Sequence, residues 1–339
     1  MPHHSPRFPR PRRRLLSGAL AFAMGLSSCA APPTSGPRDD ATGLLVLEEG
    51  GPSVTLLGTS EVRQRVTVAA GNERLAISPS GALGALSVPL DGRVQLLDVE
   101  RMRRGLDIEL GLDSRPSALA FIDDARLLIG SSISGELSLY DEAYGKVIRV
   151  IETGAASTAE LAVKPEEQMA WLLDSGAGRV LRFSWTRDDT RRSAELGDGL
   201  ICLAHRPDSQ ELWVLSKDSN RVVVLQRDTL EVLGEIPCEG GPRALAFDLG
   251  GCAWVVCEDS DEVVRYDAQT GTELARIRIP AARDGERARP VDILIEPEAD
   301  RAWVACHGSG SLQIIDQRIE RCVAEVDGLR QPTSLCFAP

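Results

Sequence analysis

The sequence predicts an all-β fold: one seven-bladed β-propeller with four antiparallel strands per blade and a ring closed by pairing of the N- and C-terminal strands. Three observations predict it. A short motif recurs about every 42 residues, each interval holds four strand-length apolar runs, and the incomplete units at the two ends complement each other. We expect residues 1–28 to be a signal peptide, 29–41 a lipidated cysteine and tether, and 42–339 the propeller.

The repeated motif consists of three apolar residues and a polar one, often followed by proline, as in Leu75-Ala76-Ile77-Ser78-Pro79. Its copies begin at Leu75, Leu119, Leu161, Leu203, Leu245, Ile293 and Leu335. Successive copies are 44, 42, 42, 42, 48 and 42 residues apart. A period of this length is typical of a propeller blade, because each blade is built from four short strands.

The unit that begins at Leu245 illustrates the interior of a blade. After the motif, apolar runs at 254–257, 262–267 and 273–277 are separated by turn residues. Each run has strand length and is rich in β-branched or aromatic residues. No stretch keeps the helical spacing of apolar residues for three turns, which argues against a helical solenoid of similar period.

The two ends of the domain predict how the ring closes. The last copy of the motif stops at residue 339 after a single strand. Near the start of the domain, the segments 44–47, 54–57 and 62–68 match the second, third and fourth strands of a unit. We therefore expect these segments to join the last strand in a seventh blade, which leaves no free sheet edge.

The first 28 residues have the features of a bacterial export signal. Arginines at 12–14 precede an apolar stretch at 15–25 that is too short to span a bilayer. The following Leu-Ser-Ser-Cys, ending at Cys29, resembles the bacterial lipobox, in which the cysteine is acylated and becomes the new N-terminus. An ordinary signal peptide with a chance cysteine is the alternative, and the export route stays open.

A lipid at Cys29 would anchor the protein to the bacterial cell envelope, facing either the periplasm or the cell surface. Residues 30–40 are proline-rich and polar, as expected of a flexible tether. The membrane is thus an expected partner through the lipid alone, since no later segment is apolar for long enough to cross it.

Composition narrows the function classes. Hydrophobic residues make up 43% and charged residues 26% of the chain, which is typical of a globular protein. The formal net charge is −12, and it becomes −17 without residues 1–28, which hold five arginines and no acidic residue. Lysine and arginine do not cluster into a basic stripe along the chain, so we expect no nucleic-acid partner. We also expect a monomer.

The units resemble the YVTN-type propeller repeat, a family related to the propeller lactonase-like superfamily. Its Tyr-Val pair is matched by Trp213-Val214, Trp254-Val255 and Trp303-Val304. Its Gly-x-Pro segment is matched by prolines three residues before a motif start, namely Pro116, Pro242, Pro290 and Pro332. The resemblance covers residues 42–339 and implies the seven-bladed fold. It does not imply a function, because propellers host many unrelated activities.

The mature chain has few residues suited to metal or cofactor chemistry. Its only histidines are His205 and His307, and His205 occupies a motif position filled by Phe121 and Phe247 in other units. We expect His205 to be a core residue between blades. No zinc-protease, c-haem or hydrolase-elbow motif occurs, so we expect no metal and no cofactor.

Seven cysteines follow Cys29, and two of them occupy equivalent positions in neighbouring units. Cys257 and Cys306 each come three residues after a tryptophan. They could form a thiol pair or a soft-metal site, or serve as small buried apolar residues. We expect the second role, because equivalent points on adjacent blades usually exceed the reach of a disulfide.

A candidate site follows from propeller geometry, in which the loops after the second strands and the loops before the innermost strands share one face. The polar residues just past the second strands are Glu48, Glu49, Asp174, Lys217, Glu258 and His307. The cations at the start of innermost strands are Arg115, Arg243 and Arg289. We expect them to form a ligand site at the mouth of the central channel. The alternative is that they are polar only because strand ends meet water.

Two functions remain open. The first is a non-enzymatic binding or scaffold lipoprotein of the envelope, which holds a protein, a glycan or a small molecule on the loop face. The second is a lactonase-like hydrolase of sugar lactones on the same face. Glu258, His307 and Arg289 could supply its general base and its oxyanion stabiliser, although no motif selects them.

Overall fold

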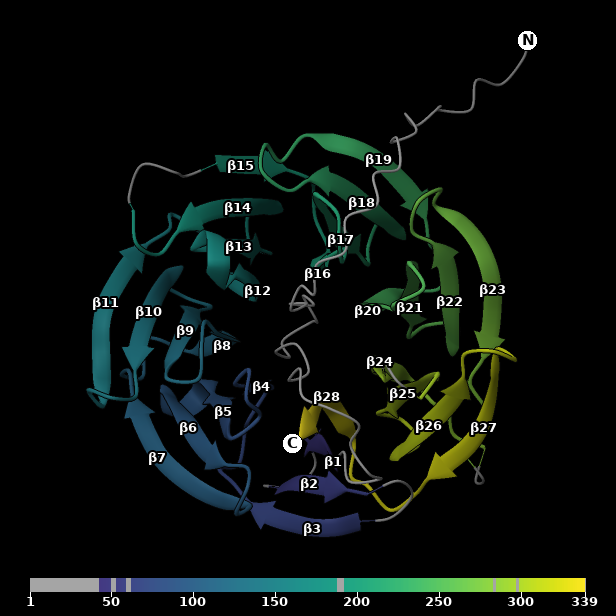
Figure 1. The fold of residues 1–339 in the computed structure, drawn as a ribbon, viewed down its shortest axis with the longest axis horizontal. Coiled ribbons are helices and arrows are strands. Elements are labelled where there is room, and N and C mark those ends of the chain that lie inside the picture. The colour runs from purple at the N-terminus through teal and green to yellow at the C-terminus, as the bar shows by residue number, and fades with distance from the viewer. Residues whose placement is uncertain are drawn as a thin grey trace, which may run out of the picture.

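The structure, a computed structural model, describes residues 43–49, 53–58, 62–187, 192–282, 285–296 and 299–338. These residues form seven four-stranded antiparallel sheets that stand as blades around a central axis (Figure 1). The predicted seven-bladed propeller is therefore confirmed. The predicted signal peptide, Cys29 and tether lie outside the described residues.

Blades 1 to 4 each follow the chain from the innermost strand to the outermost. Blade 1 consists of β4 (Arg74–Ile77), β5 (Leu83–Val88), β6 (Arg93–Asp98) and β7 (Arg103–Glu109). Blade 2 consists of β8 (Pro116–Phe121), β9 (Arg126–Ser131), β10 (Glu136–Asp141) and β11 (Lys146–Glu152). Blade 3 consists of β12 (Thr158–Lys164), β13 (Met169–Asp174), β14 (Arg179–Ser184) and β15 (Arg192–Glu195). Blade 4 consists of β16 (Leu200–His205), β17 (Glu211–Ser216), β18 (Arg221–Gln226) and β19 (Val232–Pro237).

Blades 5 and 6 repeat this order, whereas blade 7 combines both ends of the domain. Blade 5 consists of β20 (Pro242–Phe247), β21 (Cys252–Cys257), β22 (Glu262–Asp267) and β23 (Thr272–Arg278). Blade 6 consists of β24 (Pro290–Glu296), β25 (Arg301–Cys306), β26 (Ser311–Asp316) and β27 (Arg321–Val326). Blade 7 consists of β28 (Pro332–Ala338), β1 (Gly43–Glu48), β2 (Ser53–Leu57) and β3 (Val62–Thr67). Two short 3-10 helices, η1 (Pro89–Asp91) and η2 (Pro165–Glu167), follow β5 and β12.

Ring closure occurs as predicted. β28 is the innermost strand of blade 7 and pairs antiparallel with β1, in a register that places Leu44 opposite Phe337 and Val46 opposite Leu335 (Figure 1). β28 thereby takes the innermost place in the four-stranded sheet of blade 7. The energetic reason is that an exposed innermost strand would present unpaired backbone N–H and C=O groups.

The core lies between adjacent blades. Each motif copy falls in an innermost strand, and the second strands carry the largest buried side chains, including Trp171, Trp213 and Trp254. One apolar cluster joins blades 4 and 5 through Trp213 and Leu245, and another joins blades 5 and 6 through Trp254 and Ile293. No helix in the described part of the chain is both long and apolar enough to cross a membrane.

His205 is a core residue, as expected. Its imidazole is buried and packs edge-on against Trp171, with ring centroids 4.4 Å apart. Neither ring nitrogen has a hydrogen-bond partner among the described residues. Burial, with smaller effects of Arg227 and Lys164, lowers the pKa of His205 to about 3, so the ring is neutral.

Cys257 and Cys306 are both fully buried and belong to different apolar clusters, so they do not form a pair. Cys306 Sγ lies 3.7 Å from the carbonyl oxygen of Val304. Cys257 Sγ instead lies 3.7 Å from Cys238 Sγ, a contact that the repeat register did not predict.

Candidate functional site

The loop face is formed where second strands end and innermost strands begin. Glu48 and Asp174 are the last residues of β1 and β13, while Lys217, Glu258 and His307 directly follow β17, β21 and β25. The positions assigned from the repeat therefore occur on one face. The directions of their side chains decide which of these residues can meet at a ligand.

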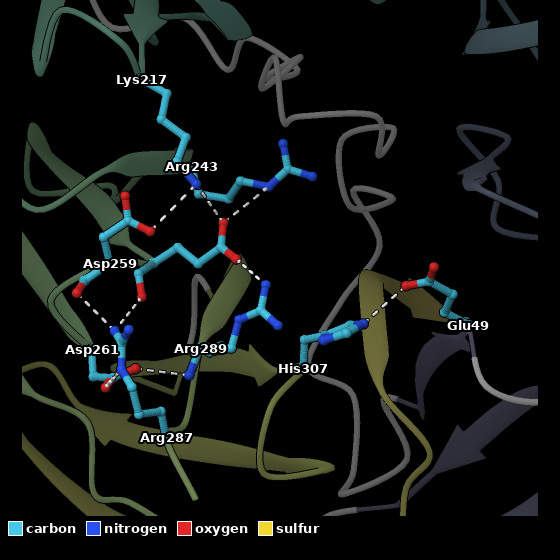
Figure 2. A network of polar contacts seen from close by, with 9 residues as sticks. Glu49, Lys217, Arg243, Asp259, Asp261, Arg287, Arg289 and His307 are labelled. Carbon is cyan, nitrogen blue, oxygen red and sulfur yellow. Dashed lines mark hydrogen bonds and ion pairs between the residues drawn. The ribbon is translucent and has the colours of Figure 1, made fainter.

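A bulge recurs near the start of the innermost strands and redirects one side chain per blade. In six blades the pairing with the second strand skips a residue, namely Ser117, Ala159, Ile201, Arg243, Val291 or Thr333. Bulges re-aim side chains and are frequent beside functional sites. Arg243 is the only charged residue of the six, and it lines the central cavity. Its guanidinium group points toward the channel (Figure 2).

Glu258 is the centre of a network that joins three blades. Its carboxylate accepts hydrogen bonds from Lys217 Nζ of blade 4 and from Arg289, at the start of blade 6, both at 2.8 Å. Arg243 Nε lies 4.0 Å from the same carboxylate. Three cations thus converge on one carboxylate, although Lys217 is also shared with Asp259 at 3.6 Å. Figure 2 shows the side chains of Lys217, Arg243 and Arg289 converging on this carboxylate.

The network fixes the charge of Glu258. Burial raises its pKa, but hydrogen bonds from Lys217 and Arg289 and the charges of Lys217 and Arg243 outweigh burial and lower the pKa overall. Glu258 is therefore an anion at neutral pH. A carboxylate held this way is a weak proton acceptor, because an effective general base has a pKa near the working pH.

Arg287 supports the network through hydrogen bonds to Asp261 and to the backbone of Glu258 and Asp259. Its Nε donates to Asp261 Oδ2 at 2.8 Å, and its Nη2 donates to the backbone carbonyls of Glu258 and Asp259 at 3.0 and 2.7 Å. Asp261 also accepts the backbone N–H of Arg289 at 2.8 Å. Sequence reasoning missed Arg287. The signal was the longest motif interval, 48 residues, which places this arginine in an extended connection before β24.

A second contact joins blades 6 and 7. His307 Nε2 lies 2.9 Å from Glu49 Oε2, and the two side chains lie to one side of the Glu258 network (Figure 2). His307 is largely buried and Glu49 is exposed. A histidine oriented by a carboxylate is the arrangement that supports proton transfer.

Two expected site residues stabilise the fold and do not line the mouth. Asp174 is fully buried, accepts the backbone N–H groups of Ala156, Ser157 and Ala177, and pairs with Arg179. Its role is to order the turns of blade 3.

Glu48 is likewise buried: it contacts Thr55 Oγ1 and the backbone N–H of Arg330, and so ties β1 to β2 and to the loop before β28. Both carboxylates are satisfied by backbone donors because buried acidic groups are costly without them.

Arg115 is exposed and lies away from the Glu258 network. It has no ion pair or side-chain hydrogen bond to any residue in the described part of the chain. Its charge acts on Glu73, whose pKa is raised by burial and lowered in part by Arg74 and Arg115. The structure therefore gathers Lys217, Arg243 and Arg289 at Glu258, with His307 and Glu49 forming a separate pair.

A polar cavity of about 30 Å³ lies in the channel beside Arg243. This volume holds one or two water molecules. Its lining includes the residue directly before the motif in six units, which are Arg74, Glu160, Cys202, Ala244, Asp292 and Ser334. The sequence signal for this cavity was the polar residue directly before the motif in four of these units, namely Arg74, Glu160, Asp292 and Ser334. The positions of the motif copies alone did not predict the cavity.

Asp292 lines the same cavity and has a raised pKa. Its carboxylate accepts the backbone N–H groups of Ile293 and of Leu335 in the next blade, at 2.9 and 2.8 Å. Glu160 accepts the N–H of Leu203 in the same way between blades 3 and 4. Burial raises the pKa of Asp292 to about 7, against the lowering effect of these hydrogen bonds. Asp292 therefore exchanges a proton near neutral pH.

The described residues contain no group of three or more His, Cys, Asp or Glu side chains arranged to hold a metal ion. The arrangement is suited instead to holding an anion. Arg243 presents guanidinium N–H groups that have no hydrogen-bond partner within the described ranges, and Arg289 and Lys217 add positive charge beside it.

No protein-family model and no curated protein match this chain. Solved structures do match it. A functionally unknown protein from Desulfotomaculum acetoxidans has a TM-score of 0.71 at 14% identity, and the alignment covers 88% of this chain and 99% of that one. The periplasmic gluconolactonase PpgL of Pseudomonas aeruginosa has a TM-score of 0.71 at 16% identity, with the same coverage.

A third match is the dihydro-haem d1 dehydrogenase NirN, with a TM-score of 0.65 at 17% identity, covering 88% of this chain and 66% of that one. The three proteins differ in what their names describe. At such identities the likeness shows a shared propeller fold and nothing more, because function depends on the site and not on the fold.

Proposed function

We propose that this chain is an exported envelope lipoprotein with YVTN-type repeats that binds a small anionic ligand, without catalysis, at the mouth formed by Lys217, Arg243 and Arg289. The observation that carries the proposal is Arg243. A bulge turns this arginine to the channel, it lines the cavity, and its nearest carboxylate atom, on Glu258, is 4.0 Å away. Within the described residues, its N–H donors make no hydrogen bond and are available to an incoming anion.

The charge balance supports an anion over a cation. The whole chain has a formal net charge of −12, yet at this mouth three cations face two acidic groups, Glu258 and Asp259. A local excess of one sign in a concave site concentrates ligands of the opposite sign. Guanidinium groups bind carboxylates and phosphates through paired hydrogen bonds, which adds geometric selectivity.

The chain direction supports an anchor on the opposite face. β1 runs from Gly43 to Glu48, and Glu48 lies at the loop face, so Gly43 is on the far face of the propeller. A tether from Cys29 would enter there. The ligand mouth would then point away from the membrane, toward dissolved ligands.

The second candidate is a lactonase-like hydrolase, and the contact between His307 and Glu49 is the observation that favours it. Here His307 would act as the general base. We prefer binding, because the cations around Glu258 make it a weak base and the pair of His307 and Glu49 lies to one side of the cations that would stabilise an oxyanion.

The test uses gluconate and glucono-lactone, which share a carbon skeleton but differ in charge. We expect the protein to bind gluconate in calorimetry and to leave the lactone unhydrolysed above the buffer rate. Arg243→Gln should weaken gluconate binding at least tenfold, since a hydrogen bond to a charged group contributes about 1.5–3 kcal/mol.

Arg276→Gln is the matched control, because this arginine pairs with Glu262 and Glu273 on the outer strands of the same blade and its loss changes the net charge equally. Equal weakening by both variants, or no binding of gluconate, inorganic phosphate or sulfate, would reject the anion site. Lactone turnover that His307→Gln abolishes would establish the hydrolase.

A further inference from the structure

We propose that Cys238 and Cys257 form a disulfide that ties the connection between blades 4 and 5 to the second strand of blade 5. Their Sγ atoms are 3.7 Å apart, and both side chains are fully buried. A disulfide has an S–S bond of about 2.05 Å, so a small rotation of the two side chains brings the sulfurs together.

The position of Cys238 gives the link a structural consequence. Cys238 follows β19, the outermost strand of blade 4, and starts the segment that crosses to β20 at the axis. Glycines at 240 and 241, both with positive φ, follow it and allow the sharp turn toward β20. The link would close a loop across a blade boundary that is otherwise held by packing and hydrogen bonds.

The same segment supports the anion site. The backbone N–H groups of Glu258 and Asp259 donate to the carbonyls of Gly241 and Gly240, at 3.0 and 2.9 Å. Cys257 directly precedes Glu258, and Arg243 is two residues past Gly241. A disulfide would therefore restrict the backbone that carries Glu258 and Arg243. The proposal itself does not depend on ligand binding and stands or falls separately.

The bond forms by thiol–disulfide exchange. In the folded chain the contact between the thiols lowers the pKa of Cys238 and raises that of Cys257. During folding, the thiolate of either cysteine can attack the oxidant. Two S–H bonds break and one S–S bond forms. The two electrons and two protons pass to a disulfide oxidant, which becomes a pair of thiols. Because both sulfurs are buried in the folded chain, exchange takes place during folding.

The remaining buried thiols provide the contrast. Cys306 ends β25, the position equivalent to Cys257 in blade 6, and its Sγ lies 3.7 Å from the carbonyl oxygen of Val304, with Ser309 and Cys322 also close to it. Cys202 lines the channel cavity. Neither has another thiol at hydrogen-bond distance among the described residues, so the pair is specific to the boundary of blades 4 and 5.

The experiment is oxidative refolding of the mature chain with oxidised glutathione, then unfolding, alkylation and peptide mapping without reductant. We expect a cross-linked peptide that contains Cys238 and Cys257, distinct from any peptide that carries the disulfide of Cys336. It should be lighter by two hydrogens than the two reduced peptides and should be separated by reductant. The map needs no variant, so a folding defect cannot obscure it. Alkylation of both residues in the refolded protein would overturn the proposal, and so would a metal ion retained between them in native mass spectrometry.

Variants test the consequence. Reduction should lower the melting temperature of the wild type and of Cys306→Ser by the same amount. It should lower the melting temperature of Cys238→Ser and Cys257→Ser by less, because Cys336 is disulfide-bonded in all four proteins. An equal effect of reduction on all four proteins would show that the pair carries no disulfide, whatever the outcome of the gluconate titration.

Discussion

Lys217 and Glu258 occupy the same repeat position in neighbouring blades, and their side chains form an ion pair of 2.8 Å across the boundary of blades 4 and 5. His307 and Glu49 repeat this relationship between blades 6 and 7, at 2.9 Å. Long side chains at this position therefore bridge adjacent blades in both places.

The first prediction concerns this bridge. In a double-mutant cycle, Lys217→Met and Glu258→Gln should show a coupling of about 1 kcal/mol in the free energy of unfolding, because both groups are largely buried and hydrogen-bonded. Glu258→Gln alone should cost more than Lys217→Met, since Arg289 also loses its partner. Urea unfolding at pH 7 measures the cycle. Strictly additive single effects would contradict it.

The second prediction concerns Asp292. Its pKa in the folded protein is about 7, above its ordinary value of 3.8, so its contribution to stability is complete below pH 3.8 and is lost as the pH rises through 7. This rise in pKa corresponds to about 4 kcal/mol. Asp292→Asn should therefore gain stability relative to the wild type between pH 4 and 8. Melting curves across this range should show the gap widening with pH, and a constant gap would refute the titration.

The third prediction concerns His205, whose two ring nitrogens have no partner in the described part of the chain. His205→Phe should raise the free energy of unfolding by about 1–3 kcal/mol, because it removes an unsatisfied buried polar group and keeps an edge-on ring against Trp171.

The gain from His205→Phe should increase on acidification. The pKa of His205 is about 3 when folded and 6.5 when unfolded, so the wild type loses stability as the pH falls below 6.5. Trp171→Phe is the control for packing, and it should destabilise at every pH. A destabilised His205→Phe would indicate a hidden polar partner.

The fourth prediction concerns ring closure. Deleting residues 332–339 removes β28 and exposes β1, β24 and β4, which pack on it or pair with it. We expect aggregation or a drop in melting temperature too large for a local change, because an open propeller exposes strand edges on both sides of the gap. A truncated chain that melts like the full-length protein would be incompatible with the closed ring.

The fifth prediction concerns the anchor. In its bacterial host the protein should fractionate with membranes, and Cys29→Ala should move it to the soluble fraction, since several acyl chains are needed for stable attachment. Mass spectrometry of the N-terminal peptide measures the lipid directly. An unmodified cysteine in the wild type would remove the anchor from the proposal.

Much of the fold could be deduced from the sequence. The motif copies located every innermost strand, the partial units at the two ends predicted the pairing of β28 with β1, and the position of His205 predicted its place in the core. These deductions succeed because the strands of a blade are consecutive in the chain. The apolar residues of each blade must also be buried against neighbouring blades of the same architecture.

The candidate site was predicted less completely. The repeat register located the loop face correctly, but it could not separate Glu258, which gathers cations, from Asp174 and Glu48, which bind backbone N–H groups inside their own turns. All three are acidic residues at the end of a second strand. Their difference lies in which donors the adjacent loops provide, and these loops vary in length and sequence between blades.

The order and pairing of the strands were thus encoded locally, in a periodic pattern of apolar and polar residues. The contacts across blade boundaries were decided by the tertiary structure: Cys238 with Cys257, Arg287 with Asp261, and Asp292 with the N–H of Leu335. The physical reason is that such contacts depend on bulges, loop paths and side-chain rotamers. These fix positions to within an ångström or so, and a sequence repeat specifies only which strand lies beside which.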